Sequence, residues 1–161
     1  MKKITKTLLS ITLIASLITA PSVRAAHLLP TPSVQIEYLD NGYYFETVIN
    51  AAPAQNSISL LSAANTITRT KTSSYKNSNG IVLWSVSITA TFTYDGSTSK
   101  CNYCYGSASA PSPSWSIQTI SASKSGNTAT ATAIATNSQG NTSSNYTKSI
   151  TIRCSKNGVI S

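Results

Sequence analysis

Alternation of apolar and hydroxyl side chains dominates the chain, and residues 83–94, LWSVSITATFTY, show it most clearly. The apolar members of this stretch fall on every second position, with Ser or Thr between them: Trp84, Val86, Ile88, Ala90, Phe92 and Tyr94. A period of two places successive side chains on opposite faces of a β-strand. The pattern therefore predicts a strand with one face in a core and the other in water.

Other strands are predicted where alternating segments are separated by turns rich in Gly and Asn. The first predicted hairpin joins 34–39 to 43–49 through the turn Asp40-Asn41-Gly42. The second joins 66–75 to 81–94 through a turn at 76–80, and the third joins 115–121 to 128–136 through a turn at 125–127. A last strand is predicted at 146–154. At about 3.3 Å per residue the 81–94 strand is unusually long, so a bulge, a bend or a split is expected. Residues 105–107 are expected to lead into a loop.

About seven antiparallel strands with no helical spacing predict an all-β domain. The favoured fold is a two-layer antiparallel β-sandwich with an immunoglobulin-like architecture, and the alternative is a small β-barrel. Ser and Thr suit the hydrated face because hydroxyls pair across strands. Flat Thr arrays of the ice-binding kind are a weaker reading, since the chain has no short fixed repeat.

The first 25 residues have the features of a secretory signal peptide. Lys2, Lys3 and Lys6 precede an apolar run at 8–20, and Val23-Arg24-Ala25 offers a cleavage site. The run is too short to span a bilayer, so no transmembrane span is expected after signal removal. We expect a flexible leader at 26–33, one domain at 34–161, and a secreted, extracellular protein.

Net charge changes once the signal peptide is set aside. The whole chain carries 12 Lys and Arg against four acids, a net charge of +8. Four of the cations lie within residues 1–25, which leaves eight against four and a net charge of +4. The remaining cations are scattered, whereas a nucleic-acid partner requires a contiguous basic patch. No nucleic-acid partner is expected.

Three cysteines, Cys101, Cys104 and Cys154, form an odd set in a chain expected to be exported. A bridge from Cys154 to either Cys101 or Cys104 closes a loop of roughly fifty residues and contributes about 4 kcal/mol. The third thiol then stays free or joins another molecule. A redox Cys-x-x-Cys needs a following helix, and zinc would need His27 from the leader, so both are weaker readings.

Catalytic groups are scarce. His27 is the single histidine and lies beside the predicted cleavage site. Glu37 and Glu46 flank the first hairpin turn, and two carboxylates across a hairpin resemble a glycosidase pair, although exposed strand charges are the plain reading. We expect no enzyme activity, no cofactor and no metal site.

Aromatic residues gather near predicted loops, where such side chains stack on sugars or on a protein partner but more often cover a core. The candidate ligand contacts are Tyr43, Tyr44, Tyr103, Tyr105 and Trp115.

Three stretches, YKNSNGIVLWSVSITATFTYDGSTSKC (75–101), SWSIQTISASKSGNTATATA (114–133) and SITIRCS (149–155), resemble small exported proteins of clostridia-like Gram-positive bacteria whose function is uncharacterised. The likeness covers most of the predicted domain. It implies export and suggests a disulfide between Cys101 and Cys154, which leaves Cys104 as the candidate free thiol. In these proteins Ser, Thr or Ala residues follow the first cysteine, so Cys104 departs from the pattern.

We therefore expect a secreted, non-enzymatic binding module that contacts a protein or a glycan at the cell surface or in the extracellular medium. The alternative is a membrane-active or toxin-like β protein, because strands that alternate apolar and hydroxyl residues also suit insertion into a bilayer.

Overall fold

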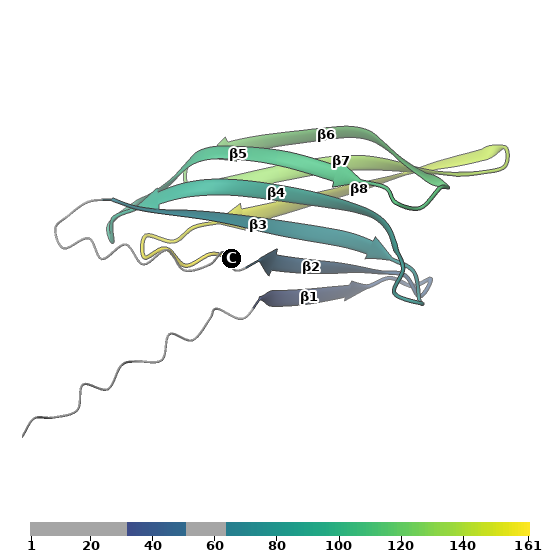
Figure 1. Cartoon of the computed structure of the whole chain (residues 1–161), viewed down its shortest axis with the longest axis horizontal. Helices are drawn as coiled ribbons and strands as arrows, with labels where there is room; N and C mark the ends of the chain where they lie inside the picture. The colour runs from purple at the N-terminus through teal and green to yellow at the C-terminus, as the bar shows by residue number, and fades with distance from the viewer. Residues whose placement is uncertain (1–31, 51–63) are drawn as a thin grey trace, which may run out of the picture.

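The computed structural model describes residues 32–50 and 64–161, which form two antiparallel sheets packed face to face as a β-sandwich (Figure 1). The five-stranded sheet contains, in spatial order, β1 (Ser33–Tyr38), β2 (Tyr44–Asn50), β3 (Asn65–Lys76), β4 (Val82–Tyr94) and β5 (Ser99–Ser109). The three-stranded sheet contains β6 (Trp115–Ser125), β7 (Thr128–Gln139) and β8 (Thr142–Arg153). The predicted β-sandwich is confirmed, and the sheets are not closed into a barrel.

The core lies between β4 of the large sheet and β7 of the small one. In the predicted 81–94 strand the alternating apolar positions from Trp84 to Phe92 are completely buried: Trp84, Val86, Ile88, Ala90 and Phe92. On β7 the inward positions from 129 to 135 carry only methyl groups, and all of them are completely buried: Ala129, Ala131, Ala133 and Ala135. Because large side chains meet small ones, the two sheets can approach closely.

Gly106 on β5 marks one place where the sheets are too close for a side chain. A methyl group at this position would lie 3.2 Å from Cβ of Ala131, 3.2 Å from Cδ1 of Ile120 and 3.3 Å from Cβ of Ala122. These distances are shorter than ordinary carbon–carbon contacts. A methyl group here would require these neighbours to shift by a few tenths of an ångström, so glycine suits the close packing of the sheets.

The outward faces of both sheets carry hydroxyls that bond to each other across strands. Between β3 and β4 the side-chain oxygens of Thr70 and Thr89 lie 2.7 Å apart, and the pairs Thr68–Thr91 and Thr72–Ser87 repeat the contact. Between β7 and β8 the oxygens of Thr132 and Ser149 lie 2.7 Å apart. The Ser and Thr hydroxyls on these faces thus satisfy part of one another's hydrogen-bonding capacity.

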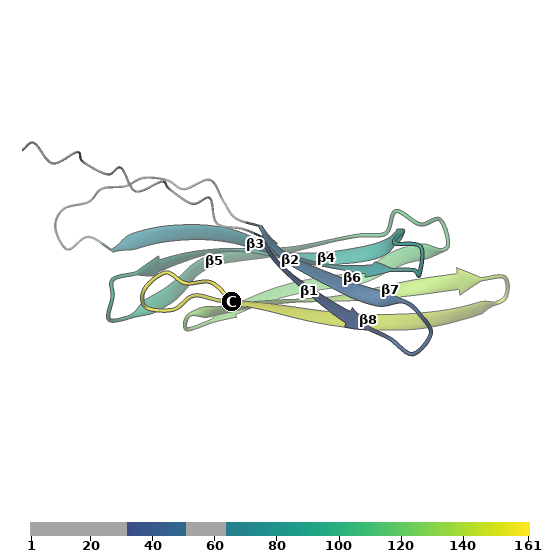
Figure 2. The ribbon, with the colours of Figure 1, turned by 90° about the horizontal axis from the view of Figure 1, so that it is seen from below.

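The large sheet extends past the small one, and two lysines bridge the open side. Lys71 of β3 donates to the carbonyl of Thr151 on β8, at 2.9 Å. Lys148 of β8 lies 2.7 Å from the Glu37 carboxylate of β1 and 3.9 Å from the centre of the Phe45 ring. Figure 2 shows β1 and β2 crossing obliquely in front of the longer strands. Lys148 joins both of these strands to β8. Inward-pointing charges at a sheet edge also oppose edge-to-edge aggregation.

Two expectations about the strands need correction. Residues 105–107 do not lead into a loop, because they belong to β5, which spans Ser99–Ser109. A bulge explains the error: Phe92 pairs with Cys101 and Thr91 with Tyr103, so Asn102 is an extra residue that breaks the alternation. The last strand begins at Thr142, earlier than predicted.

The fold shares the packing of two sheets with an immunoglobulin domain but differs from it in how the strands are connected. Among the described strands the chain changes sheet once, between β5 and β6, so each sheet is a meander of consecutive strands. An immunoglobulin domain instead uses Greek-key connections between its sheets. The long β4 remains one strand, with the expected irregularity near its start, where Tyr75 pairs with Trp84 but Lys76 with Val82.

The predicted signal peptide at 1–25 and most of the predicted leader lie outside the described residues. Ser33, the last residue assigned to the leader, is the first residue of β1.

Enlarging Ala131 tests the close packing of the sheets. In Ala131→Leu we expect the free energy of unfolding to fall by about 1–3 kcal/mol, because the added carbons have no space opposite Gly106. Urea unfolding measures the change. Ser123→Leu adds a leucine on the exposed side of β6 and should change stability by no more than about 0.5 kcal/mol. Equal effects of the two substitutions would contradict the packing described.

Candidate functional site

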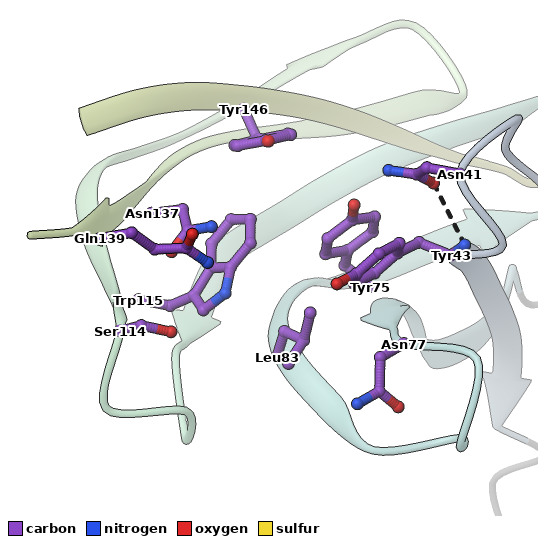
Figure 3. Close-up of a pocket in the computed structure, with 10 residues that line it drawn as sticks. All are labelled: Asn41, Tyr43, Tyr75, Asn77, Leu83, Ser114, Trp115, Asn137, Gln139 and Tyr146. Atoms are coloured by element: carbon purple, nitrogen blue, oxygen red, sulfur yellow. Dashed lines mark hydrogen bonds between the residues drawn. The ribbon is translucent and has the colours of Figure 1, made fainter. Parts of the chain in front are cut away.

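Four hairpin and loop segments meet at one end of the sandwich. Because the strands alternate in direction, every odd-numbered strand runs toward this end and every even-numbered strand leaves it (Figure 1). A cavity of about 320 Å³ opens here between the sheets. Its lining comes from both sheets and their turns: Asn41, Tyr43, Tyr75, Asn77, Leu83, Ser114, Trp115, Asn137, Gln139 and Tyr146 (Figure 3).

Aromatic rings form one wall of the pocket and are packed against one another. Trp115, only 8% exposed, has its ring centre 6.3 Å from that of Trp84 and 4.9 Å from that of Tyr146. Tyr75 lies 5.4 Å from Trp115 and stacks on Tyr43 at 5.5 Å. The rings therefore stabilise this end of the core, and the faces of Trp115 are largely covered by protein.

Two asparagines on turns shape the rim and are fixed by their own backbone contacts. The Asn41 side-chain oxygen accepts a hydrogen bond from the Tyr43 backbone N–H at 3.1 Å, drawn in Figure 3. The Asn77 oxygen accepts from the backbone N–H groups of Asn79 and Ile81, at 3.1 and 2.9 Å. Such bonds are typical of Asn in turns. They leave the Asn77 NH₂ group for another partner.

Asn137 is the most unusual member of the site. It lies directly opposite Trp115 in the β6–β7 register. Its Oδ1 atom is buried and has no hydrogen-bond partner among the described residues. A buried polar atom without a partner costs about 1–3 kcal/mol. Such an atom in a native pocket calls for an explanation, and a bound ligand or water supplies one.

The chemistry of the pocket is uncharged. None of its ten lining residues is Asp, Glu, Lys, Arg or His. Burial raises the pKa of the Tyr75 phenol, although its hydrogen bond to the Asn41 side chain acts in the opposite direction. Tyr75 therefore stays protonated throughout the neutral pH range. The site offers amides and hydroxyls, which bind and orient a ligand but provide no general acid or base.

The structure brings together two of the five predicted ligand contacts. Tyr43 and Trp115 line the pocket. Tyr44 is not among the lining residues and packs instead on Tyr38, with ring centres 5.7 Å apart. Tyr103 and Tyr105 lie on β5, 59% and 49% exposed, and contact each other at 6.1 Å.

The sequence did not point to the amides of the site, yet the strand register contains a signal for two of them. Asn137 and Gln139 continue the alternation that places Ala129 and Ala135 inward, and Tyr146 pairs with Ala135 on the neighbouring strand. Counting two more alternate positions beyond Ala135 gives residues 137 and 139. A pattern of apolar residues does not include them, because both side chains are polar.

All three cysteines lie away from the pocket and are free thiols in the structure: Cys101 and Cys154 are buried and Cys104 partly buried. The structure contains no bond between Cys101 and Cys154, and their pairing stays a prediction. Each of the two buried thiols instead donates to a backbone carbonyl, Cys101 to Tyr103 at 3.4 Å and Cys154 to Ser155 at 3.3 Å. Burial, reinforced by the neighbouring Cys104, raises the pKa of the Cys101 thiol.

The carboxylates of the first hairpin do not form a catalytic pair. Glu37 pairs with Phe45 and Ile36 with Glu46, so the two carboxylates lie on opposite faces of the hairpin. Each is bound to its own lysine: Glu37 to Lys148 at 2.7 Å, and Glu46 to Lys76 at 2.6 Å. Two carboxylates on opposite faces cannot flank one glycosidic bond, as the acid and the nucleophile of a glycosidase must.

Within the described ranges no three His, Cys, Asp or Glu residues group as metal ligands. His27, the fourth ligand in the weaker zinc reading, lies outside those ranges. Residues 32–50 and 64–161 contain no helix with the length and apolarity needed to cross a membrane.

Comparison with protein-family models, with curated proteins and with solved structures finds no match to this chain. The resemblance to exported clostridia-like proteins therefore stays a prediction from its motifs.

Thiol labelling tests the placement of the cysteines. In the reduced protein we expect iodoacetamide to modify Cys104 first, because Cys101 and Cys154 are buried and the raised pKa of Cys101 lowers its thiolate fraction at any given pH. Mass spectrometry of tryptic peptides follows each site. Cys104→Ser should remove the fast phase, and all three thiols should react after unfolding. Labelling of Cys101 as fast as Cys104 in the folded protein would contradict the structure.

Proposed function

We propose that this chain is an exported, non-enzymatic binding module that acts at the cell surface or in the extracellular medium. Its ligand site is the pocket formed by the turns at one end of the sandwich. The buried, unpartnered oxygen of Asn137 is the observation that carries the proposal, because a ligand donor would satisfy it. The features of residues 1–25 support export.

The lining also supports binding over catalysis. Amides and hydroxyls on short, hydrogen-bonded turns form a preorganised site, which lowers the entropic cost of binding. Side chains that would act as nucleophile and base are not found together in the pocket.

The membrane-active alternative is less well supported. The alternating strands that would suit a bilayer already bury their apolar face against the other sheet, as Val86, Ile88 and Phe92 do. Inserting them into lipid would require the two sheets to separate.

We propose in addition that export leads to oxidation of Cys101 and Cys154 to a disulfide, with Cys104 left free. Their backbone N–H groups donate to the consecutive carbonyls of Gly126 and Asn127, at 2.8 and 3.0 Å, so both cysteines flank the same turn. Two thiols would lose two protons and two electrons to an extracellular disulfide, forming one S–S bond.

Alkylation of the secreted protein, unfolded without reductant, tests this oxidation. We expect one label on the unreduced chain and three after reduction, counted by mass. The single label should lie on Cys104. Three labels without reduction would show that the thiols stay free outside the cell.

Binding assays with variants of the pocket test the ligand site. The mature protein is applied to a glycan array, to purified bacterial cell wall and to an array of extracellular proteins. For any probe that it binds, we expect Asn137→Leu to weaken binding by about 10–100-fold, the loss of one or two buried hydrogen bonds. Surface plasmon resonance gives the dissociation constants.

Two controls keep the result specific. Ser123→Ala, on the exposed side of β6, should bind as the wild type does. If the double substitution Tyr103→Ala and Tyr105→Ala removes binding while Asn137→Leu does not, the ligand site lies on β5 and the proposal for the pocket is wrong. Release of dye from liposomes by the wild type would favour the membrane-active alternative.

A further inference from the structure

We infer that the ligand of this pocket is a neutral saccharide, with one sugar residue held by hydrogen bonds to the Asn137 oxygen and to the amides of Asn77 and Gln139. The inference rests on the proposed function, since it names the chemical class of the ligand for the same site.

Charge is the first criterion that selects this class. A phosphate, a carboxylate or a peptide terminus would enter a site whose ten lining residues include no charged side chain. Moving an ion out of water without a partner of opposite charge is costly. The ligand that fits is uncharged.

The aromatic wall excludes a mainly apolar ligand. Trp115 is covered by Trp84 and Tyr146, and Tyr75 is only 2% exposed. A lipid chain or aromatic ligand would gain little from rings whose faces already contact protein. Most of its surface would meet amides and hydroxyls that it leaves without partners.

The donors and acceptors that remain available match hydroxyl groups. The Asn137 oxygen is an acceptor that the fold leaves without a partner, and a turn of its side chain toward the pocket would present it to a ligand. Asn77 has donors left because its oxygen already accepts two backbone bonds. The Gln139 side chain makes no hydrogen bond to another described residue and offers both kinds of group. A sugar hydroxyl donates and accepts at once, so adjacent hydroxyls on one ring satisfy both kinds of group.

Size agrees with a single sugar residue. The volume of about 320 Å³ lies at the small end of the range for ligand pockets. The site opens at the end of the sandwich, among turns, so a longer glycan can continue outward from the bound residue (Figure 3).

Titration with defined sugars tests the inference. Glucose, galactose, mannose and N-acetylglucosamine are added separately to the isotope-labelled mature protein, with glucuronic acid and an uncharged blocked tripeptide as comparators. We expect saturable shifts in the amide resonances of residues 137 and 139 for at least one neutral sugar. The expected Kd is on the order of 1 mM, typical of a ligand of about a dozen heavy atoms.

Binding of an uncharged ligand by uncharged side chains also predicts a Kd that depends little on salt or pH. The Kd should stay constant from about 50 to about 500 mM salt, because no ion pair is screened. It should stay constant from about pH 5 to about pH 8, because the lining contains no Asp, Glu, Lys, Arg or His and burial raises the pKa of Tyr75.

Matched amide variants complete the test. Asn137→Leu should weaken sugar binding at least tenfold and keep the native near-ultraviolet dichroism, since it removes an oxygen that bonds to nothing in the fold. Asn157→Leu makes the same replacement at an exposed turn near the C-terminus and should leave the Kd unchanged.

The outcomes separate the two proposals. Binding that depends on Asn137 but occurs only with glucuronic acid or with the peptide overturns the saccharide and leaves the pocket as a ligand site. Sugar binding that Asn137→Leu does not alter places the sugar elsewhere and also overturns the inference. If no probe on any array binds in a way that depends on the pocket, both proposals fail.

Discussion

The close contact between the bulky face of β4 and the alanine face of β7 is the constraint on which the rest of the molecule depends. Trp84, Ile88 and Phe92 fill the space between the sheets, so the opposing strand has room for methyl groups only. The same closeness favours Gly106 on β5, where even one carbon would be crowded. The repeated Thr-Ala of residues 128–133 then has a physical reason: alanine is the residue that fits inward, and threonine suits a hydrated strand face.

The unequal widths of the two sheets explain the placement of charge. Three strands cannot cover five, so the inner side of β1 and β2 lacks a full apolar partner. Lys71 and Lys148 reach across this open side, one to a backbone carbonyl and one to a carboxylate and a ring. Both amino groups find partners there, and long lysine side chains are commonly used in this way at the margin of a core.

Period-two alternation was sufficient to predict the sandwich because it is a direct consequence of strands with one buried face. It failed at β5 for a physical reason. The extra residue Asn102 shifts the phase, so that Cys101 and Cys104 face the core although three positions apart. Alternation also separates sequence neighbours: Tyr43 lines the pocket, whereas Tyr44 packs on Tyr38. A cluster of aromatic residues in the sequence is therefore a poor guide to a shared site in a strand protein. The four amides of the pocket come from three separate segments, and only the pairing of strands brings them together.

Asn137 follows the alanines of β7 in the same inward register, where the packing between the sheets would favour another apolar side chain. An amide there leaves a buried oxygen without a partner and lowers the stability of the fold. Local violations of packing rules occur preferentially at functional sites, where a ligand supplies the missing interaction. The neighbouring turns are consistent with this view, since Asn41 and Asn77 are held in place by backbone bonds before any ligand arrives. At one end of the sandwich, packed aromatic rings thus hold the backbone in place, while amide groups beside them lack partners within the fold. A preorganised binding site requires this combination.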